Sequence, residues 1–404
     1  MYGASGTYSV KLSPESARWL KPKQRLRTRQ FQEFCIYLAS KVSYRVAIEI
    51  LKRSWHLRGD EILKKSTYEE WIESVGSSLG EAIENKTETI LSCYGIDSEG
   101  YVTEKASIPS SAREPSLPPE KSEAEVRLQI REYNRGREPG TKIRYGNRTR
   151  HIEGSDNGCC YISIDDVLVK SQKDSREKGY RKSHRFVSNT VVHIQYESQS
   201  YVLTAAGLDR AMKSTLAFVL SNHLLEDKRL IFFSDGATAI RDAIERYFSF
   251  REHTLILDWY HLKNKCDQFL SMGTKGSMEQ RKEIKRKLAA ILWAGNTEKA
   301  KRYVLSIGHK NVKNQNQLDD LCAYLDRKSP YIACYALRKG FGLRNSSNPV
   351  EKANDRVVAA RQKKKGMSWS NLGSNALAVI SAVSINGELS NWIYKRDFPF
   401  RMAA

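Results

Sequence analysis

Apolar residues in the first hundred positions of the chain recur with the period of an α-helix. Four of them fall at spacings of three, four and seven, which places them on one helix face: Phe31, Phe34, Cys35 and Leu38. A second amphipathic helix is predicted from Ser43. A third begins at the capping-box pattern of 66–69 and continues to Gly76. Residues 1–103 are therefore predicted to be mainly helical.

The spacing of these helices fits a helix-turn-helix at about 43–76, and it also fits an ordinary helical hairpin. The segment 21–29 contains five basic residues and no acidic one, which favours a DNA-binding domain. The next segment, 104–122, has four prolines among serines and glutamates and is typical of a linker. A helix is predicted at 123–135, and a basic approach segment completes the region 104–157.

From Cys159 onward the helical period gives way to apolar runs typical of strands. Five strands are predicted, at 161–169, 187–196, 201–206, 229–236 and 254–258. Two helices are predicted between them, at about 210–225 and 237–247. Three strands in succession followed by strand–helix units predict a mixed α/β sheet. A mainly helical stretch follows. We expect one domain over 158–272 and 346–404, interrupted by an all-helical insertion at 273–345.

Composition limits the classes of protein. The formal net charge is +21, which favours a polyanionic partner, and 40% hydrophobic residues suit a folded chain. No apolar run is long enough to span a membrane, and the first residues lack a signal-peptide pattern, so we expect a cytoplasmic protein. The seven cysteines include no C-x-x-C pair, so neither a disulfide framework nor a zinc site is expected.

Two aspartates end apolar strands. Asp165 and Asp235 come at the end of the apolar runs of the first and fourth predicted strands, and the carboxyl ends of such strands are where α/β proteins place their sites. Two carboxylates brought together repel each other unless a cation neutralises them, and Mg²⁺ suits such ligands. Either aspartate alone is as well explained by the end of a strand and the start of a turn.

A third carboxylate would complete such a site, and two residues are candidates. Asp258 ends the fifth predicted strand. Glu351 opens a helix, where Asn348 as N-cap and Pro349 at the first helical position also make it part of a capping box. The residue pattern alone does not choose between them.

These motifs, in this order, resemble the DDE transposases of the Mutator-like superfamily, in its bacterial insertion-sequence branch. The matching segments are 162–166, 233–237, the Asp-x-x-His element at 258–261, the segment 348–354, Arg361 and the Gly-Met-x-Trp at 366–369. The resemblance covers about 158–395. It implies an RNase H-like catalytic domain and a transposase that cleaves DNA and joins 3′-OH ends to target DNA.

The resemblance also implies roles for individual residues. Asp165, Asp235 and Glu351 would be the catalytic, metal-binding triad, with Asp258 and His261 as accessory residues. Asp166 follows Asp165 directly, so either is a candidate for the first ligand, although strand alternation lets only one of them face the site. His261 has an alternative explanation as a packing histidine.

Phosphodiester cleavage by such a triad uses two Mg²⁺ or Mn²⁺ ions per active site. The chain has no G-x-x-x-x-G-K-[ST] motif, so no nucleotide cofactor is expected. The expected partners are double-stranded DNA, as transposon ends and target, and further copies of the chain in a dimer or larger assembly. A nuclease or resolvase that does not join strands, and a regulator that only binds DNA, are the alternatives.

Basic residues outside the triad are expected to contact phosphates, although any one run also fits a solvated helix face. The candidates are Lys21, Lys23, Arg25, Arg27, Arg29, Arg181, Lys182, Arg185, Arg281, Lys285, Arg286, Arg361, Lys363 and Lys364. Reading of the end sequence is assigned to 43–76.

Overall fold

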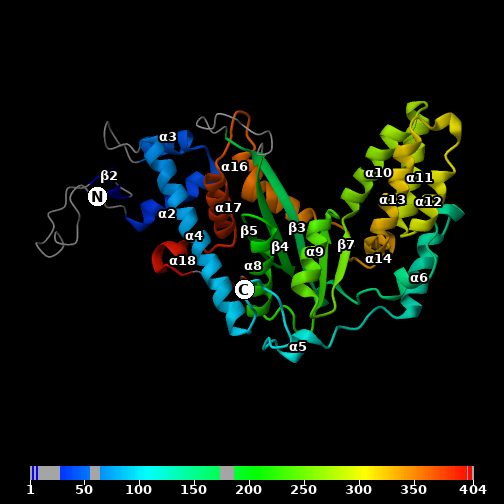
Figure 1. The fold of residues 1–404 in the computed structure, drawn as a ribbon, viewed down its shortest axis with the longest axis horizontal. Coiled ribbons are helices and arrows are strands. Elements are labelled where there is room, and N and C mark those ends of the chain that lie inside the picture. The colour runs from blue at the N-terminus through cyan, green and yellow to red at the C-terminus, as the bar shows by residue number, and fades with distance from the viewer. Residues whose placement is uncertain are drawn as a thin grey trace, which may run out of the picture.

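The sheet lies at the centre of the molecule, with helices packed beside it and a helical arm rising from one side (Figure 1). A computed structural model describes residues 2–3, 6–7, 28–54, 64–172, 186–397 and 399–402. The predicted mixed α/β class is confirmed over these residues. None of the helices described is both long enough and apolar enough to span a membrane.

Five strands form the main sheet in the order β5-β4-β3-β6-β7. Their bounds are β3 Cys159–Lys170, β4 Phe186–Tyr196, β5 Gln199–Ala205, β6 Arg229–Ser234 and β7 Thr254–Leu257. β3, β4 and β5 pair antiparallel, whereas β6 and β7 run parallel to β3. Helices α8 (Leu208–Ser221) and α9 (Thr238–Phe248) make the crossovers. A short pair, β1 (Tyr2–Gly3) and β2 (Gly6–Thr7), lies outside this sheet.

The strands bury apolar side chains on both faces. Along β3, Cys160, Ile162 and Ile164 belong to one core, while Cys159 and Tyr161 belong to a second core that includes the arm. This alternation is the ordinary consequence of strand geometry. The polar residues after the apolar run are therefore held at one edge of a rigid sheet.

Three helices precede the sheet, and the third differs from its prediction. α2 (Arg29–Lys41) and α3 (Tyr44–Ser54) agree with the sequence pattern, but α4 (Lys65–Cys93) runs straight through Gly76. A Cβ at Gly76 would lie 2.5 Å from the Cβ of Ala376, so this glycine permits close helix packing and does not end a helix. The predicted capping box at 66–69 is also wrong, because Lys64 is the N-cap and no side chain caps the helix.

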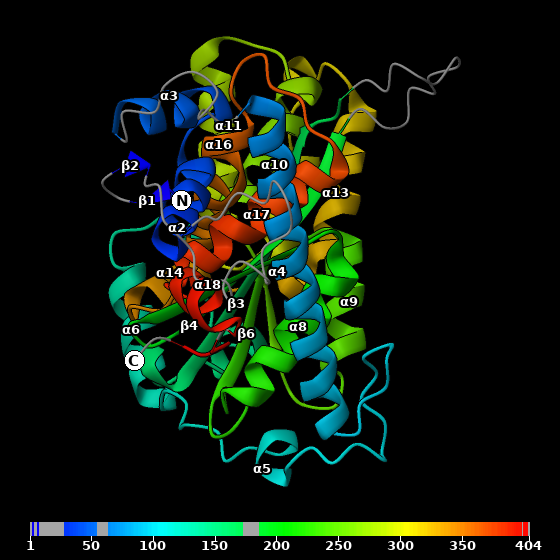
Figure 2. The ribbon, with the colours of Figure 1, turned by 90° about the vertical axis from the view of Figure 1, so that its left-hand side faces the viewer.

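α4 crosses the C-terminal helices α17 (Asn371–Ile385) and α18 (Leu389–Lys395) on its way to α8 (Figure 2). The most extensive of these contacts are with α17 and α8. Residues of α2, α3 and α4 join the same core as β3 and β4. The turn of the predicted helix-turn-helix falls at 55–63, outside the described residues.

The region 104–157 is folded: its first part, with α5, packs on the core of the sheet, and its later part, from α6 on, packs on the arm. It contains α5 (Ser110–Arg113), α6 (Glu123–Asn134), η2 (Pro139–Thr141), α7 (Asn147–Arg150) and η3 (Asp156–Gly158). α6 agrees with the helix predicted at 123–135, and it begins at a capping box formed by Ser122 and Glu125. A buried ion pair joins Glu153 to Arg338, with N–O distances of 2.6 and 2.7 Å. The segment therefore braces the arm.

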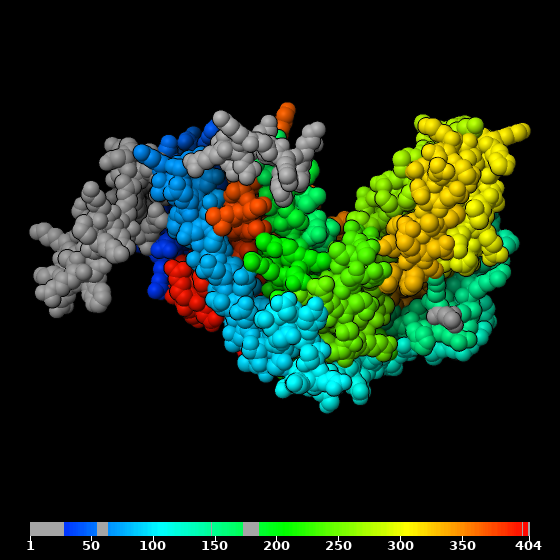
Figure 3. Space-filling model, in the orientation of Figure 1, coloured from blue at the N-terminus to red at the C-terminus, as the bar shows by residue number. Residues whose placement is uncertain are grey.

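The arm holds most of the predicted helical insertion. It comprises α10 (Trp259–Gly273), α11 (Met278–Trp293), α12 (Thr297–Leu305), η4 (His309–Asn311), α13 (Gln315–Lys328), η5 (Ser329–Tyr331) and α14 (Tyr335–Gly340). The chain then returns to the sheet through α15 (Asn348–Asn354), the π-helical turn η6 (Asp355–Ala359) and α16 (Ala360–Gln362). The surface is deeply hollowed between the sheet and the arm (Figure 3).

Candidate functional site

Asp165 and Asp235 lie at the same edge of the sheet. β3 and β6 are parallel neighbours whose last paired residues are Ser163 and Phe233. Each aspartate lies two residues further along the chain: Asp165 is still within β3, which continues to Lys170, and Asp235 comes directly after the end of β6. The Oδ1 atom of Asp235 accepts a hydrogen bond from the N–H of Ala237 at 2.7 Å. Parallel pairing of β3 and β6 thus brings the two positions to the same end of neighbouring strands.

The neighbouring aspartate, Asp166, points elsewhere. Its Oδ1 atom accepts a hydrogen bond from the hydroxyl of Thr190 on β4 at 2.5 Å. Asp165 instead accepts a 2.6 Å hydrogen bond from the side-chain amide of Asn354 on α15. Asp165 is half-buried and Asp166 is exposed. The geometry thus favours Asp165 as the residue that shares a site with Asp235.

The electrostatics of Asp165 reflect a crowded acidic site. Burial raises the pKa of its carboxyl, and the charge of Asp235 raises it further. The hydrogen bond from the N–H of Asp166, the interaction with His261 and the amide of Asn354 act in the opposite direction. The net effect is that the pKa of the Asp165 carboxyl lies above its ordinary value, with burial as the largest cause.

Glu351 comes from the first turns of α15, in a different register from the one predicted. Ser347, and not Asn348, is the N-cap of this helix, so the predicted capping box is wrong. The carboxylate of Glu351 lies 3.5 Å from the Nε2 atom of His261, at the start of α10. Glu351 therefore does not cap its own helix, and its side chain contacts His261 instead.

Asp258 has the structural role instead. It is fully buried and caps α10 by accepting a 2.9 Å hydrogen bond from the N–H of His261. Its other oxygen accepts hydrogen bonds from the N–H of Ser347 at 2.5 Å and from the Ser347 hydroxyl at 3.0 Å. Asp258 therefore ties the start of α10 to the start of α15, which brings His261 and Glu351 together.

The acidic side chains do not form a closed ligand set as they lie. Among the residues that the structure describes, no three His, Cys, Asp or Glu side chains are close enough to hold a metal ion together. Asp165 is engaged by Asn354, and Glu351 is engaged by His261. The site brings all the parts to one edge of the sheet, with Glu351 turned towards the histidine.

Two residues at this edge were assigned no role from the sequence. Asn354 is 8% exposed, and its Oδ1 atom has no hydrogen-bond partner. Lys328, at the end of α13, donates a 2.6 Å hydrogen bond to the carbonyl of Gly236. The π-helical turn after Asn354 is a feature often found at functional sites, but no residue pattern announces it.

A family model matches residues 160–394, which span almost all of the sheet, the arm and the C-terminal helices. The chain belongs to UPF0236, an uncharacterised protein family. No curated protein matches the sequence. Among solved structures, the chain is similar to the Drosophila P element transposase strand transfer complex, with 10% identity and a TM-score of 0.29 over 94% of this chain and 84% of that chain. A TM-score this low does not establish a common fold.

The UPF0236 region contains all three residues of the predicted triad and several of the predicted DNA contacts. Lys363 and Lys364 are exposed after α16. On α11, Arg281 is exposed, Lys285 donates to the hydroxyl of Ser271, and Arg286 forms a bidentate ion pair with Glu283. These positions are compatible with phosphate contact.

Other predicted contacts fare differently. Arg361 is 2% exposed and donates to the carbonyl of Ala39, so burial contradicts its prediction as a DNA contact. Arg29 is exposed but donates to the carbonyl of Tyr394. The remaining candidates lie outside the described residues: Lys21, Lys23, Arg25, Arg27, Arg181, Lys182 and Arg185.

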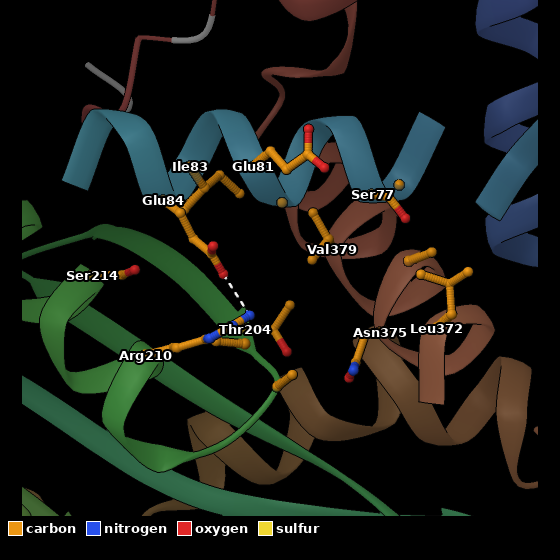
Figure 4. Close-up of a pocket in the computed structure, with 15 residues that line it drawn as sticks. Ser77, Glu81, Ile83, Glu84, Thr204, Arg210, Ser214, Leu372, Asn375 and Val379 are labelled. Carbon is orange, nitrogen blue, oxygen red and sulfur yellow. Dashed lines mark hydrogen bonds and ion pairs between the residues drawn. The ribbon is translucent and has the colours of Figure 1, made fainter. Parts of the chain in front are cut away.

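One cavity lies away from the acidic edge, between α4, which precedes the UPF0236 region, and elements of that region. It measures about 230 Å³ and is enclosed by α4, α17, the end of β5 and the start of α8 (Figure 4). The ion pair between Arg210 and Glu84 crosses it at 2.8 Å. None of the predicted site residues lines it. The cavity is a consequence of how α4 packs on the sheet.

Proposed function

We propose that this chain is a DDE-type DNA transposase with an RNase H-like catalytic domain, and that Asp165, Asp235 and Glu351 form its metal-binding triad. The observation that carries the proposal is the pair of aspartates at one edge of two parallel strands, where burial and like charge act on the same carboxyl. A fold gains nothing from such repulsion unless a cation joins the site. The Mutator-like branch is part of the proposal.

The donors at this edge fit a hard divalent cation. All three proposed ligands are carboxylates, which suit Mg²⁺ or Mn²⁺, and no cysteine accompanies them. When bound, two such ions supply an activated oxygen nucleophile and neutralise the charge on the leaving oxygen. The unpartnered oxygen of buried Asn354 also leaves room at the site for a water or a ligand.

The chain's own residues would then have distinct tasks. Asn354 orients the Asp165 carboxylate through its side-chain amide. His261 holds Glu351 at the edge of the site until that carboxylate joins the two aspartates. The proposed reaction opens a DNA strand at the end of the element with water, leaving a 3′-OH. That 3′-OH then attacks the target strand and displaces its 3′ oxygen.

One observation favours a second candidate, a regulator that binds DNA without cutting it. Glu351 contacts His261, and the acidic side chains do not form a closed set among the residues described. A regulator would bind duplex DNA and leave it intact. A nuclease on the same fold would cut the DNA without joining it. Each of these functions gives a different set of products.

The test is a strand-transfer reaction with Mg²⁺ and duplex DNA that carries the pre-cut sequences flanking the gene. We expect joined product from the wild type and none from Asp235→Asn or Glu351→Gln. Asp166→Asn is the matched control, because that carboxylate faces Thr190 and should leave joining intact. Asp258→Ala is a poor test of ligation, since that residue holds two helix starts.

Several results would contradict the proposal. Cut but unjoined DNA supports the nuclease, and intact bound DNA supports the regulator. Normal joining by Glu351→Gln would remove Glu351 from the triad. Joining that is lost in Asp166→Asn and kept in Asp165→Asn would move the first ligand to Asp166. Calorimetry with Mg²⁺ alone reads the metal site independently of the reaction.

A further inference from the structure

The outward face of α10 begins at the acidic site. His261, which contacts Glu351, is followed at three, seven and ten residues by Asn264, Gln268 and Ser271. This spacing puts all four on one side of the helix. The opposite side carries the buried residues Leu262, Cys266, Leu270 and Gly273, which pack within the arm. The polar face therefore points away from the arm.

The face runs along the hollow between the arm and the sheet. Figure 1 draws α10 as the helix of the arm nearest the sheet, and Figure 3 shows the hollow beside it. A shallow depression of about 620 Å³ is lined by Asn264, Asp267, Gln268, Ser271 and Met272. From His261 to Ser271 the helix rises roughly 15 Å. That length spans roughly four base pairs of duplex DNA at 3.4 Å each.

The chemistry of the face is neutral along its centre and basic at its flanks. Asn264 and Gln268 present side-chain amides, which pair with the edge of adenine through two hydrogen bonds. Lys285, from α11, donates to Ser271 at 2.7 Å and brings a cation to the end of the face. Lys265 is exposed at the side of this face, whereas the ammonium of Lys263 forms an ion pair with Asp267 at 3.1 Å.

The long helix α4 offers the opposite chemistry. It carries six glutamates and two lysines, and Glu70, Glu81 and Glu88 are exposed. A helix with that charge is repelled by phosphates, so α4 suits a base-reading role less well than the face of α10 does. Neutral amides with flanking lysines are the pattern of a helix that reads a groove.

We propose that the outward face of α10 reads base edges of the duplex DNA that lies against the acidic site, with Asn264 and Gln268 as the residues that set sequence preference. The inference rests on the proposed function, since it places substrate DNA at Asp165 and Asp235. Phosphate contacts from Lys265 and Lys285 hold the duplex but carry no sequence information. A protein partner is the competing occupant, and the test separates the two.

The experiment selects bound duplexes from a library with a randomised central segment, using the full chain. We expect the wild type to enrich a motif. Asn264→Ala and Gln268→Ala should each relax one position of it by about tenfold, because each removes one amide–base pairing. Affinity for an arbitrary duplex should change less than about twofold in both. Lys285→Ala should instead weaken all sequences together and reduce the salt dependence.

Asn85→Ala is the matched control, because Asn85 is an exposed asparagine on α4. It should leave the motif unchanged. An unchanged motif in Asn264→Ala and Gln268→Ala overturns the inference, and so does a wild type that enriches no motif. Altered self-association in those variants, with an unchanged motif, would assign the face to a protein partner. Mg²⁺-dependent strand joining is measured separately. Loss of joining by the wild type refutes the proposed function, whereas an unchanged motif in the α10 variants refutes only the α10 assignment.

Discussion

Arg361 gives the sharpest test of how the N-terminal helices are held. Its Nε donates a 2.8 Å hydrogen bond to the carbonyl of Ala39 at the end of α2. Its guanidinium carbon lies 4.9 Å from the ring centre of Tyr44 in α3 and 5.0 Å from that of Trp369. One buried cation thus joins α2, α3 and the segment after α16. Its replacement should loosen that junction.

Arg361→Met keeps much of the volume and removes the charge. A hydrogen bond from a charged donor contributes roughly 1.5–3 kcal/mol, and its loss also leaves the Ala39 carbonyl buried without a partner. Each desolvated cation–π contact adds about 1–2 kcal/mol. Methionine recovers part of this through its own packing. We therefore expect a loss of roughly 3–5 kcal/mol in the free energy of unfolding, a large share of a typical total of about 5–15 kcal/mol.

Urea unfolding followed by circular dichroism measures this change, and DNA binding at several salt concentrations accompanies it. Lys363→Ala and Lys364→Ala are the matched controls, because both lysines are exposed in the same basic run. They should unfold within about 0.5 kcal/mol of the wild type and lose DNA affinity with a shallower salt slope. If Arg361→Met has the same free energy of unfolding as the wild type and also shows that shallower salt slope, the structural role is refuted and Arg361 is again a DNA contact.

Three further predictions follow from single residues. Burial lowers the pKa of His193 to about 4 from 6.5, so its contribution to stability is complete above pH 6.5 and is lost as the pH falls towards 4. At pH 5 the free energy of unfolding of the wild type should be about 2 kcal/mol lower than above pH 6.5, whereas His193→Gln should not show this loss. Urea unfolding across pH measures both proteins, and equal losses would contradict the prediction. Gly236 has a φ of +86°, and an added Cβ would lie 2.7 Å from a methyl of Leu257, so Gly236→Ala should destabilise by about 1–2 kcal/mol while Gly308→Ala, in open space, should not. Asn354→Ala should weaken Mg²⁺ binding roughly tenfold in calorimetry, because it frees the Asp165 carboxylate; an unchanged affinity would remove its positioning role.

The strands could be predicted closely because their signals are local. Runs of β-branched and aromatic residues mark β3, β4 and β6, and their observed bounds differ from the predicted ones by one or two residues. The order of three antiparallel strands before the parallel units also follows from the lengths of the connections. The positions of Asp165 and Asp235 then follow without any knowledge of side-chain contacts. Local pattern and global fold agree at this edge of the sheet.

The errors arose where a residue's partner is distant in the sequence. Gly76 fits the pattern of a helix end, but a glycine is needed there because Ala376, three hundred residues later, packs against it. The capping rules placed the start of α15 one residue late, because Ser347 is held by Asp258 from another helix. Arg361 lies in a basic run and yet is buried under aromatic rings. Local rules rank what a residue can do, and tertiary packing selects among those roles.

Burial also changes what the net charge of +21 means. Four arginines donate hydrogen bonds to carbonyl oxygens or to Glu153, a role that suits the forked guanidinium: Arg148, Arg251, Arg338 and Arg361. Lysines make up much of the basic surface left to a polyanion, including 363–365 after α16 and those of α10 and α11. In Figure 1, α16 lies on the sheet side of the hollow and α11 lies in the arm on its other side. We infer that a duplex in the hollow would meet cations from both sides, while Asp267, the carboxylate that lines the α10 depression, is paired with Lys263. The acidic site would then need bound cations before a phosphate can approach it.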